Sequence, residues 1–218
     1  MIVTIDGPAG AGKSYAARAL AGRLGFRFLD TGATYRAVAF AAQCRGVDFN
    51  NEQALAELSS DVDIELTESQ VLVDGEDVTD EIRTSAVTSV IHFVADNKRV
   101  RENLVSLQRQ IVANDNVVTE GRDQGTVAFP HAECKIFLTA SNEERARRRW
   151  LDLQERGEQV PFEEVLAQQN VRDRQDESRK VGRLVKADGA IEVSTDGMTP
   201  DQVVDRLEEI VRSKQITE

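Results

Sequence analysis

Residues 7–14 read GPAGAGKS and match the pattern GxxxxGK[ST] in full. Glycines at these spacings let successive backbone N–H groups turn toward the oxygens of a phosphate. Lys13 would carry its positive charge to the β- and γ-phosphates of a nucleotide, and the Ser14 hydroxyl would bind Mg²⁺. The segment therefore predicts a nucleotide-binding loop. The predicted ATP-binding residues are Gly7, Pro8, Ala9, Gly10, Ala11, Gly12, Lys13, Ser14 and Tyr15.

Two further segments carry arginines suited to a second anionic ligand. DTGATYR (residues 30–36) and EGRDQGT (residues 120–126) each follow a predicted buried strand. The carboxyl ends of parallel strands meet at one rim of a sheet, where ligands bind in such folds. Arg36 and Arg122 could therefore meet there and hold a phosphate. Each arginine alone could equally belong to a surface ion pair, but beside a phosphate loop they favour a small phosphorylated substrate.

The charge balance narrows the class of ligand. The chain has 218 residues and a formal net charge of −11, whereas proteins that hold long nucleic acids are normally basic over at least one face. Its arginines are nevertheless clustered, most densely at residues 145–149, which favours a small polyanion over a polymer. No apolar run approaches the roughly 20 residues that span a bilayer. We therefore expect a soluble cytoplasmic protein that binds neither a nucleic-acid polymer nor a membrane.

Cysteine and histidine residues do not suggest a metal site. Cys44 and Cys134 lie far apart in the sequence, and their apolar neighbours predict that both are buried, reduced thiols. His92 and His131 are isolated, which argues against a histidine-based site.

Hydrophobic patterns predict the elements that position the phosphate loop. Residues 3–6 form a short apolar run before it, and apolar residues at spacings of three and four over residues 16–24 predict a helix after it. Strand, glycine-rich turn and helix make up the first unit of a parallel α/β sheet. Five strands separated by helices indicate an α/β fold, a five-stranded parallel sheet with helices on both faces. The other strands are expected at 26–29, 116–119, 135–138 and 190–193, and a further helix at 34–43.

Two segments depart from this alternation. Residues 62–78 alternate apolar and polar around Asp74-Gly75, a strong signal for a hairpin, so we expect a small antiparallel β insert at about residues 61–85. Residues 143–186 read as charged helices rich in arginine. They could be a solvated helical pair, but beside a phosphate site they suggest a helical lid at about residues 145–180. We expect one domain over residues 1–218 that carries both lobes.

The motifs, taken in order, resemble those of one family. GPAGAGKS, DTGATYR, EGRDQGTVAFP, KIFLTAS, EERARRR and RDRQDESR look like the bacterial cytidylate kinase family, and the likeness covers nearly the whole chain. The phosphate loop is widely shared, whereas GRDQGT combined with RDxxDxxR and the insert is far more particular. The resemblance implies the P-loop NTPase fold and transfer of the γ-phosphoryl group of ATP to CMP or dCMP, with Mg²⁺ as cofactor and a monomeric enzyme.

The resemblance also implies roles for individual residues. Arg36 and Arg122 would hold the acceptor phosphate, Asp123 would accept from the cytosine amino group, and Arg101 would reach the pyrimidine edge. Uracil presents a carbonyl where cytosine presents an amine, so a buried carboxylate facing uracil would lose roughly 1–3 kcal/mol. The implied CMP-binding set is Thr31, Arg36, His92, Arg101, Arg122, Asp123, Arg172 and Asp176. The implied catalytic set is Lys13, Arg122, Arg148, Arg149 and Arg179.

The sequence departs from the family pattern at four positions. His92 stands where the family usually has a serine that helps to read the base, and Tyr15 replaces a threonine after the loop serine. Lys98 and Arg183 stand where prolines are common. The first departure bears on the choice of base.

Other functions stay open at this point. Kinases for UMP, dTMP or shikimate are the nearest alternatives, followed by a nucleotide-dependent switch that binds a partner protein and by a nucleic-acid-binding ATPase. The sequence lacks a guanine-reading NKxD motif and the LSGGQ signature of transport ATPases.

Overall fold

The computed structural model describes residues 1–67, 69–112 and 115–216. The chain divides into two compact units. The first is assembled from Met1–Phe28, Asn116–Arg179 and Arg183–Glu218, and the second from Leu29–Asp115 and Lys180–Gly182. Both units are therefore built from stretches that are far apart in the sequence.

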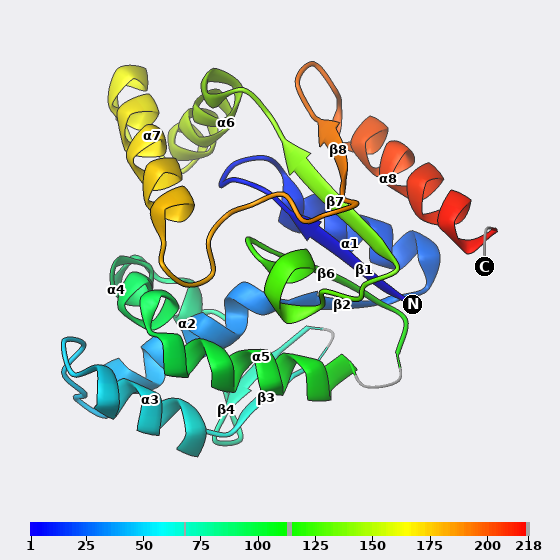
Figure 1. Ribbon diagram of the computed structural model, residues 1–218. Helices are drawn as coiled ribbons and strands as arrows, with labels where there is room; N and C mark the ends of the chain where they lie inside the picture. Colours follow the sequence, from blue (N-terminus) through cyan, green and yellow to red (C-terminus); the bar gives the residue numbers. More distant parts are fainter. Residues whose placement is uncertain (68, 113–114, 217–218) are drawn as a thin grey trace. The chain divides into compact units, whose positions relative to one another are not determined.

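A five-stranded parallel sheet with the order β2-β6-β1-β7-β8 is the centre of the first unit, and its edge strand β2 continues into the second (Figure 1). The central strand β1 pairs with β6 and β7, and β7 pairs with β8. Val3 and Ile5 of β1 are fully buried, as expected for a strand covered on both faces. The predicted sheet is confirmed. Its strands are β1 (Ile2–Asp6), β2 (Arg27–Asp30), β6 (Val117–Gly121), β7 (Cys134–Thr139) and β8 (Ile191–Ser194).

Helices α1 (Lys13–Leu24) and α8 (Pro200–Gln215) pack side by side on one face of this sheet (Figure 1). Ala16, Leu20 and Leu207 are buried in the core that these helices share with β1 and β7. Thr199 and Gln202 form a capping box that fixes the start of α8.

Two more helices, α6 (Asn142–Glu155) and α7 (Phe162–Ser178), pack against each other around a small core of their own. Trp150 and Phe162 meet edge to face in it, with ring centroids 6.5 Å apart. These helices occupy most of the segment predicted to be a lid. A π-helix, η2 (Gln124–Ala128), follows β6.

The second unit has a separate hydrophobic core that includes Leu55, Ile82 and Leu104. Most residues of α2 are buried, and its alanines allow close packing of the neighbouring helices. The Asp30 carboxylate caps α2 by accepting from the Ala33 N–H. The elements are α2 (Thr31–Cys44), α3 (Glu52–Asp61), α4 (Ser85–Asp96), α5 (Lys98–Val112), the 3₁₀ helix η1 (Glu81–Arg83), and strands β3 (Ile64–Leu66), β4 (Val71–Val73) and β5 (Glu76–Asp77).

The predicted hairpin is present in the second unit. Asp74 and Gly75 have φ values of 52° and 82° and connect β4 to β5, as a type I′ turn requires. Strand β3 pairs antiparallel with β4 and completes a three-stranded sheet. The Asp74 carboxylate stabilises the pairing of β3 with β4, since its Oδ1 accepts from the Asp63 N–H at 3.1 Å.

The expectation that both cysteines are buried is wrong for Cys44. This residue ends α2 and is exposed, because Ala41 and Ala42 fill the core side of the same turn. Cys134 in β7 is fully buried, and burial raises the pKa of its thiol to about 11. Within the described residues no helix is both long and apolar enough to cross a bilayer.

Candidate active site

The phosphate loop joins the end of β1 to the start of α1. Gly7 passes so close to β7 that a Cβ atom there would lie 1.9 Å from the Leu138 carbonyl oxygen, so only glycine fits. Gly10 and Gly12 have φ values of 79° and 87°, a conformation that other residues rarely adopt. Gly12 is the N-cap of α1, where no side chain of the described residues caps the helix. The N–H groups of the first turn of α1 are therefore suited to bind phosphate.

Lys13 is a buried cation at the base of this loop. Lys13 is 5% exposed, and its Nζ donates to the Pro8 carbonyl at 2.8 Å. Burial lowers the pKa of Lys13 to about 7, helped by the charge of Arg122 and opposed by Glu120 and Asp6. A bound triphosphate would supply the missing negative charge and favour the ammonium form.

Ser14 and Glu120 could provide the oxygen ligands of a magnesium ion. The Ser14 hydroxyl donates to Glu120 Oε1 at 2.6 Å, and Glu120 lies beside Ile5 in the register of β6 and β1. Mg²⁺ in nucleotide sites takes few protein oxygens and keeps phosphates and waters as its other ligands. Among the described residues, no group of three or more His, Cys, Asp and Glu side chains could hold a metal. The Ser14 and Glu120 oxygens are of the kind that Mg²⁺ takes as ligands.

Asp6 positions the segment that follows β6. Its carboxylate accepts from the backbone N–H groups of Gln124 at 2.8 Å and Gly125 at 2.7 Å. These bonds hold the first turn of η2, and Arg122 and Asp123 directly precede that turn. Burial raises the pKa of Asp6 to about 6 in spite of the two hydrogen bonds, and the charge of Asp123 adds to the effect.

The raised pKa of Asp6 predicts a pH-dependent stability. The Asp6 carboxyl keeps its proton up to a pH of about 6 in the folded state, but only up to 3.8 in the unfolded chain. Protonation of Asp6 therefore stabilises the folded state fully below pH 3.8, and this stabilisation is lost as pH rises through 6. The difference corresponds to about 3 kcal/mol. Urea unfolding of the wild type and of Asp6→Asn between pH 4 and 6.5 should give a flatter pH profile for the variant. Parallel profiles would contradict the assignment.

Asp176 of α7 holds two of the predicted site arginines. Arg122 Nε donates to Asp176 Oδ2 at 2.8 Å, and Arg179 Nη1 lies 3.1 Å from Oδ1. Burial alone would raise the pKa of Asp176, but the charges of Arg122, Arg179 and Arg172 keep it below its usual value. Asp176, Arg122 and Arg179 form one fixed cluster at the end of α7. Arg172 lies on the same helix.

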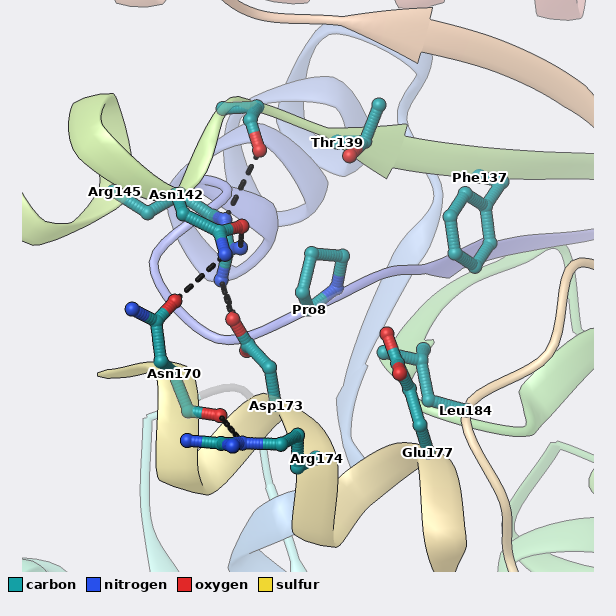
Figure 2. A pocket seen from close by; sticks show the side chains of 11 residues that line it. Pro8, Phe137, Thr139, Asn142, Arg145, Asn170, Asp173, Arg174, Glu177 and Leu184 are labelled. Atoms are coloured by element: carbon teal, nitrogen blue, oxygen red, sulfur yellow. Dashed lines mark hydrogen bonds and ion pairs between the residues drawn. The ribbon is translucent and has the colours of Figure 1, made fainter. Parts of the chain in front are cut away.

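Arg145 connects the phosphate loop to α6 and α7. Its side chain is 3% exposed, and Nη1 donates to the Ala9 carbonyl at 3.0 Å and to Asp173 Oδ1 at 2.9 Å. Its Nε donates to the Ala140 carbonyl at 3.0 Å, and the Asn142 amide oxygen accepts from Nη2. Figure 2 shows this side chain pointing from α6 toward Asp173 on α7. Arg145 thus belongs to the framework of the site.

Arg148 and Arg149 lie one turn further along α6. Arg148 donates to Thr195 through Nη1 at 3.0 Å and Nη2 at 2.9 Å, and a Cβ on Gly12 would be 3.9 Å from its Nη1. Its guanidinium therefore lies beside the phosphate loop. Arg149 is exposed.

A cavity of about 550 Å³ adjoins the loop at Pro8 (Figure 2). Phe137 and Leu184 give it an apolar side, and the Arg145–Asp173 ion pair and two asparagines give it a polar one. Its lining residues are Pro8, Phe137, Thr139, Ala140, Asn142, Arg145, Asn170, Asp173, Arg174, Glu177 and Leu184.

The remaining predicted acceptor residues belong to the second unit. Thr31 is buried in the first turn of α2, and a Cβ on Gly32 would be 3.2 Å from Nη1 of Arg36. Arg101 is buried on α5, with its Cζ 5.2 Å from the centre of the Tyr35 ring. His92 is exposed on α4.

Comparison with known proteins identifies the relatives of this chain. Residues 3–213 match the family model of cytidylate kinase. The chain belongs to the cytidylate kinase family. A cytidylate kinase from Rhodopirellula baltica is 50% identical, over 97% of this chain and 93% of its own length. One from Geobacter sulfurreducens is 43% identical, over 99% of this chain and 94% of its own length.

Solved structures support the fold. The crystal structure of a shikimate kinase from Bacteroides thetaiotaomicron superposes with a TM-score of 0.52 at 12% sequence identity, covering 97% of this chain and 98% of that one. At that identity the likeness shows the P-loop kinase fold alone. The resemblance to the cytidylate kinase family and the predicted fold are both confirmed.

The sequence alone did not reveal three residues of the site in this member of the cytidylate kinase family. Asp6 and Glu120 sit at the ends of adjacent parallel strands, a position that could have marked them. Arg145 appeared in the sequence only as one of four clustered arginines. The buried alanine that follows it, Ala146, was the available sign that this side of α6 faces inward.

Proposed function

We propose that this enzyme transfers the γ-phosphoryl group of MgATP to CMP or dCMP and releases ADP with CDP or dCDP. The observation that carries the proposal is membership of the cytidylate kinase family over residues 3–213, combined with a phosphate loop whose glycines have the required backbone conformation. Phosphoryl transfer needs positioning and neutralisation of charge more than covalent participation by the protein. The buried Lys13 and the first turn of α1 meet that need.

Each part of the site has a proposed role in the transfer. Mg²⁺, held by Ser14 with Glu120 nearby, would neutralise charge on the ATP phosphates. Lys13 would bind the β- and γ-phosphates, and Arg148 would meet them from α6, beside Gly12. The acceptor phosphate is already ionised near neutral pH, so no general base is required. Arg122 would hold this phosphate with its guanidinium fixed by Asp176, and Arg36 would do so from α2.

Three further residues belong to the proposed acceptor set. Arg172 and Asp176 would contact the ribose side, and Thr31 would bind CMP from α2. Arg179, a member of the proposed catalytic set, would approach the phosphates as α6 and α7 close. In this proposal residues 145–180 act as a lid that limits hydrolysis by water, and residues 61–85 belong to the monophosphate-binding lobe. Arg149 completes the basic surface of the lid.

Asp123 is proposed to read the base. The residue is 4% exposed, and its carboxylate would accept from the exocyclic amine of cytosine, whereas uracil would face it with a carbonyl. Asp123→Ala should reduce the preference for CMP over UMP, measured as a ratio of kcat/KM, by about 10- to 100-fold, because a buried unpaired group costs roughly 1–3 kcal/mol. The KM for ATP should stay within about threefold. An unchanged CMP/UMP ratio would show that Asp123 does not read the base.

Labelled ATP separates a kinase from a nucleotide-dependent switch. With ATP carrying label in its γ-phosphate, a cytidylate kinase delivers the label to CDP, and only when CMP is present. A switch releases it as inorganic phosphate at a rate that CMP does not change. Label in phosphate alone would overturn the proposal.

A monomeric state and a cytoplasmic location are also proposed, on the resemblance alone. Gel filtration that gives the mass of one 218-residue chain, with and without nucleotides, would support the first of these.

A further inference from the structure

Gly182 lies against the guanidinium group of Arg101. It is buried, has a φ of 66°, and belongs with Lys180 and Val181 to the second unit, which also contains Arg101. A Cβ atom on Gly182 would lie 2.0 Å from Cζ of Arg101, 2.2 Å from Nη2 and 2.4 Å from Nη1. Because Cζ is closer than either nitrogen, the glycine lies over the face of the guanidinium plane and not at its edge.

Other contacts hold the same guanidinium from other directions. Arg101 Nη1 donates to the Ala95 carbonyl at 3.1 Å, and the ring of Tyr35 lies near Cζ. Arg101 is 5% exposed, so its side chain has little freedom to move aside without disturbing these neighbours. Position 182 favours glycine for its backbone conformation, and, independently, a Cβ atom there would have to displace the guanidinium group of Arg101.

We infer that Gly182 is a positioning residue that sets the orientation in which Arg101 reaches the pyrimidine. The inference rests on the proposed function and on the role that the family resemblance implies for Arg101, which is to reach the pyrimidine edge of the acceptor. Gly182 follows Arg179 at the end of α7. The short segment after the proposed lid thus packs against the guanidinium group of Arg101. The identity of residue 182 therefore helps to determine which pyrimidine is accepted.

Two substitutions test the contact against a matched control. Gly182→Ala adds the Cβ that collides with Arg101, and Gly182→Asn adds it with a residue that tolerates positive φ better. Gly189→Ala is the control, because Gly189 has a φ of 73° and a Cβ there would meet no atom within 4 Å. Both Gly182 variants should lose about 10- to 100-fold in kcat/KM for CMP and shift the CMP/UMP ratio, since misplacing a binding group by about 1 Å has effects of that order. Gly189→Ala should stay within about threefold of the wild type.

A double-mutant cycle with Arg101→Ala identifies the route of the effect. Adding Gly182→Ala to Arg101→Ala should produce no further loss in kcat/KM for CMP. One outcome would overturn this inference and leave the proposed function intact. In it, the wild type uses CMP, and the Gly182 variants match Gly189→Ala in rate and in CMP/UMP ratio. Full additivity in the cycle would also overturn it. A wild type inactive on CMP would instead overturn the proposed function and the role of Arg101 with it.

Discussion

Replacing Lys13 with alanine should lower the turnover number with CMP by on the order of 10³-fold. The ammonium group is buried at the base of the phosphate loop and bound to the Pro8 carbonyl, so it is held in place before ATP arrives. A preorganised charge of this kind stabilises the transferring phosphoryl group without rearrangement during the reaction. Initial rates of ADP formation at saturating ATP and CMP measure the effect.

The free energy of unfolding of Lys13→Ala shows whether the loss of turnover comes from unfolding. Burial already lowers the pKa of Lys13 to about 7, so removal of the charge should leave the free energy of unfolding unchanged or higher. Lys186→Ala is the matched control, because Lys186 pairs with Glu192 at the surface and should affect neither activity nor stability. Turnover of Lys13→Ala within tenfold of the wild type would contradict the role of this lysine.

Replacing Arg145 with methionine should destabilise the first unit by about 3–5 kcal/mol. The substitution leaves the Asp173 carboxylate buried and takes a donor from the Ala9 and Ala140 carbonyls. Gln169 would still donate to Asp173 and Ala9, each at 3.1 Å, but it carries no charge. Denaturant unfolding measures the loss, and a raised KM for ATP should accompany it because Ala9 belongs to the phosphate loop.

Two further variants test the origin of that effect. Arg147 lies on the same helix in an exposed pair with Glu144, so Arg147→Ala should change the free energy of unfolding by less than about 1 kcal/mol. Adding Asp173→Leu to Arg145→Met should recover part of the stability, since no buried charge then stays unpaired. A loss below 1 kcal/mol for Arg145→Met would mean that the pair does not hold the loop.

The fold could be predicted because its signals are local. GxxxxGK[ST] between an apolar run and a helical pattern fixes a strand, a turn and a helix within residues 3–24. Asp74-Gly75 likewise encodes its turn in two adjacent residues, both of which adopt positive φ. The strands β1, β6 and β7 contain short apolar runs, and the edge strands β2 and β8 contain two apolar residues each, so all five could be located.

The supporting contacts of the site could not be predicted, because they join residues that are distant in the sequence. Asp6 accepts from Gln124 and Gly125, and Ser14 donates to Glu120, only after β1 and β6 have paired. Helical periodicity in a charged segment does not show which arginine faces inward. Arg145 does so on α6, whereas Arg149 is exposed.

The choice of base depends on few residues. His92 is exposed on α4, with its ring 4.1 Å from that of Phe93, and in the proposed site Asp123 and Arg101 would read the base. If His92 contributes, His92→Ser should change the CMP/UMP ratio.

The most direct measurement of the central claim is the rate of ADP release at saturating MgATP with CMP, dCMP, UMP, dTMP, AMP or shikimate, beside a control without acceptor. We expect fast turnover with CMP and dCMP, and rates near the control with AMP, dTMP and shikimate. Fast turnover with UMP as well would keep the kinase and contradict cytosine selection by Asp123. Equal rates with every acceptor and with none would contradict the assignment of a cytidylate kinase activity to this chain.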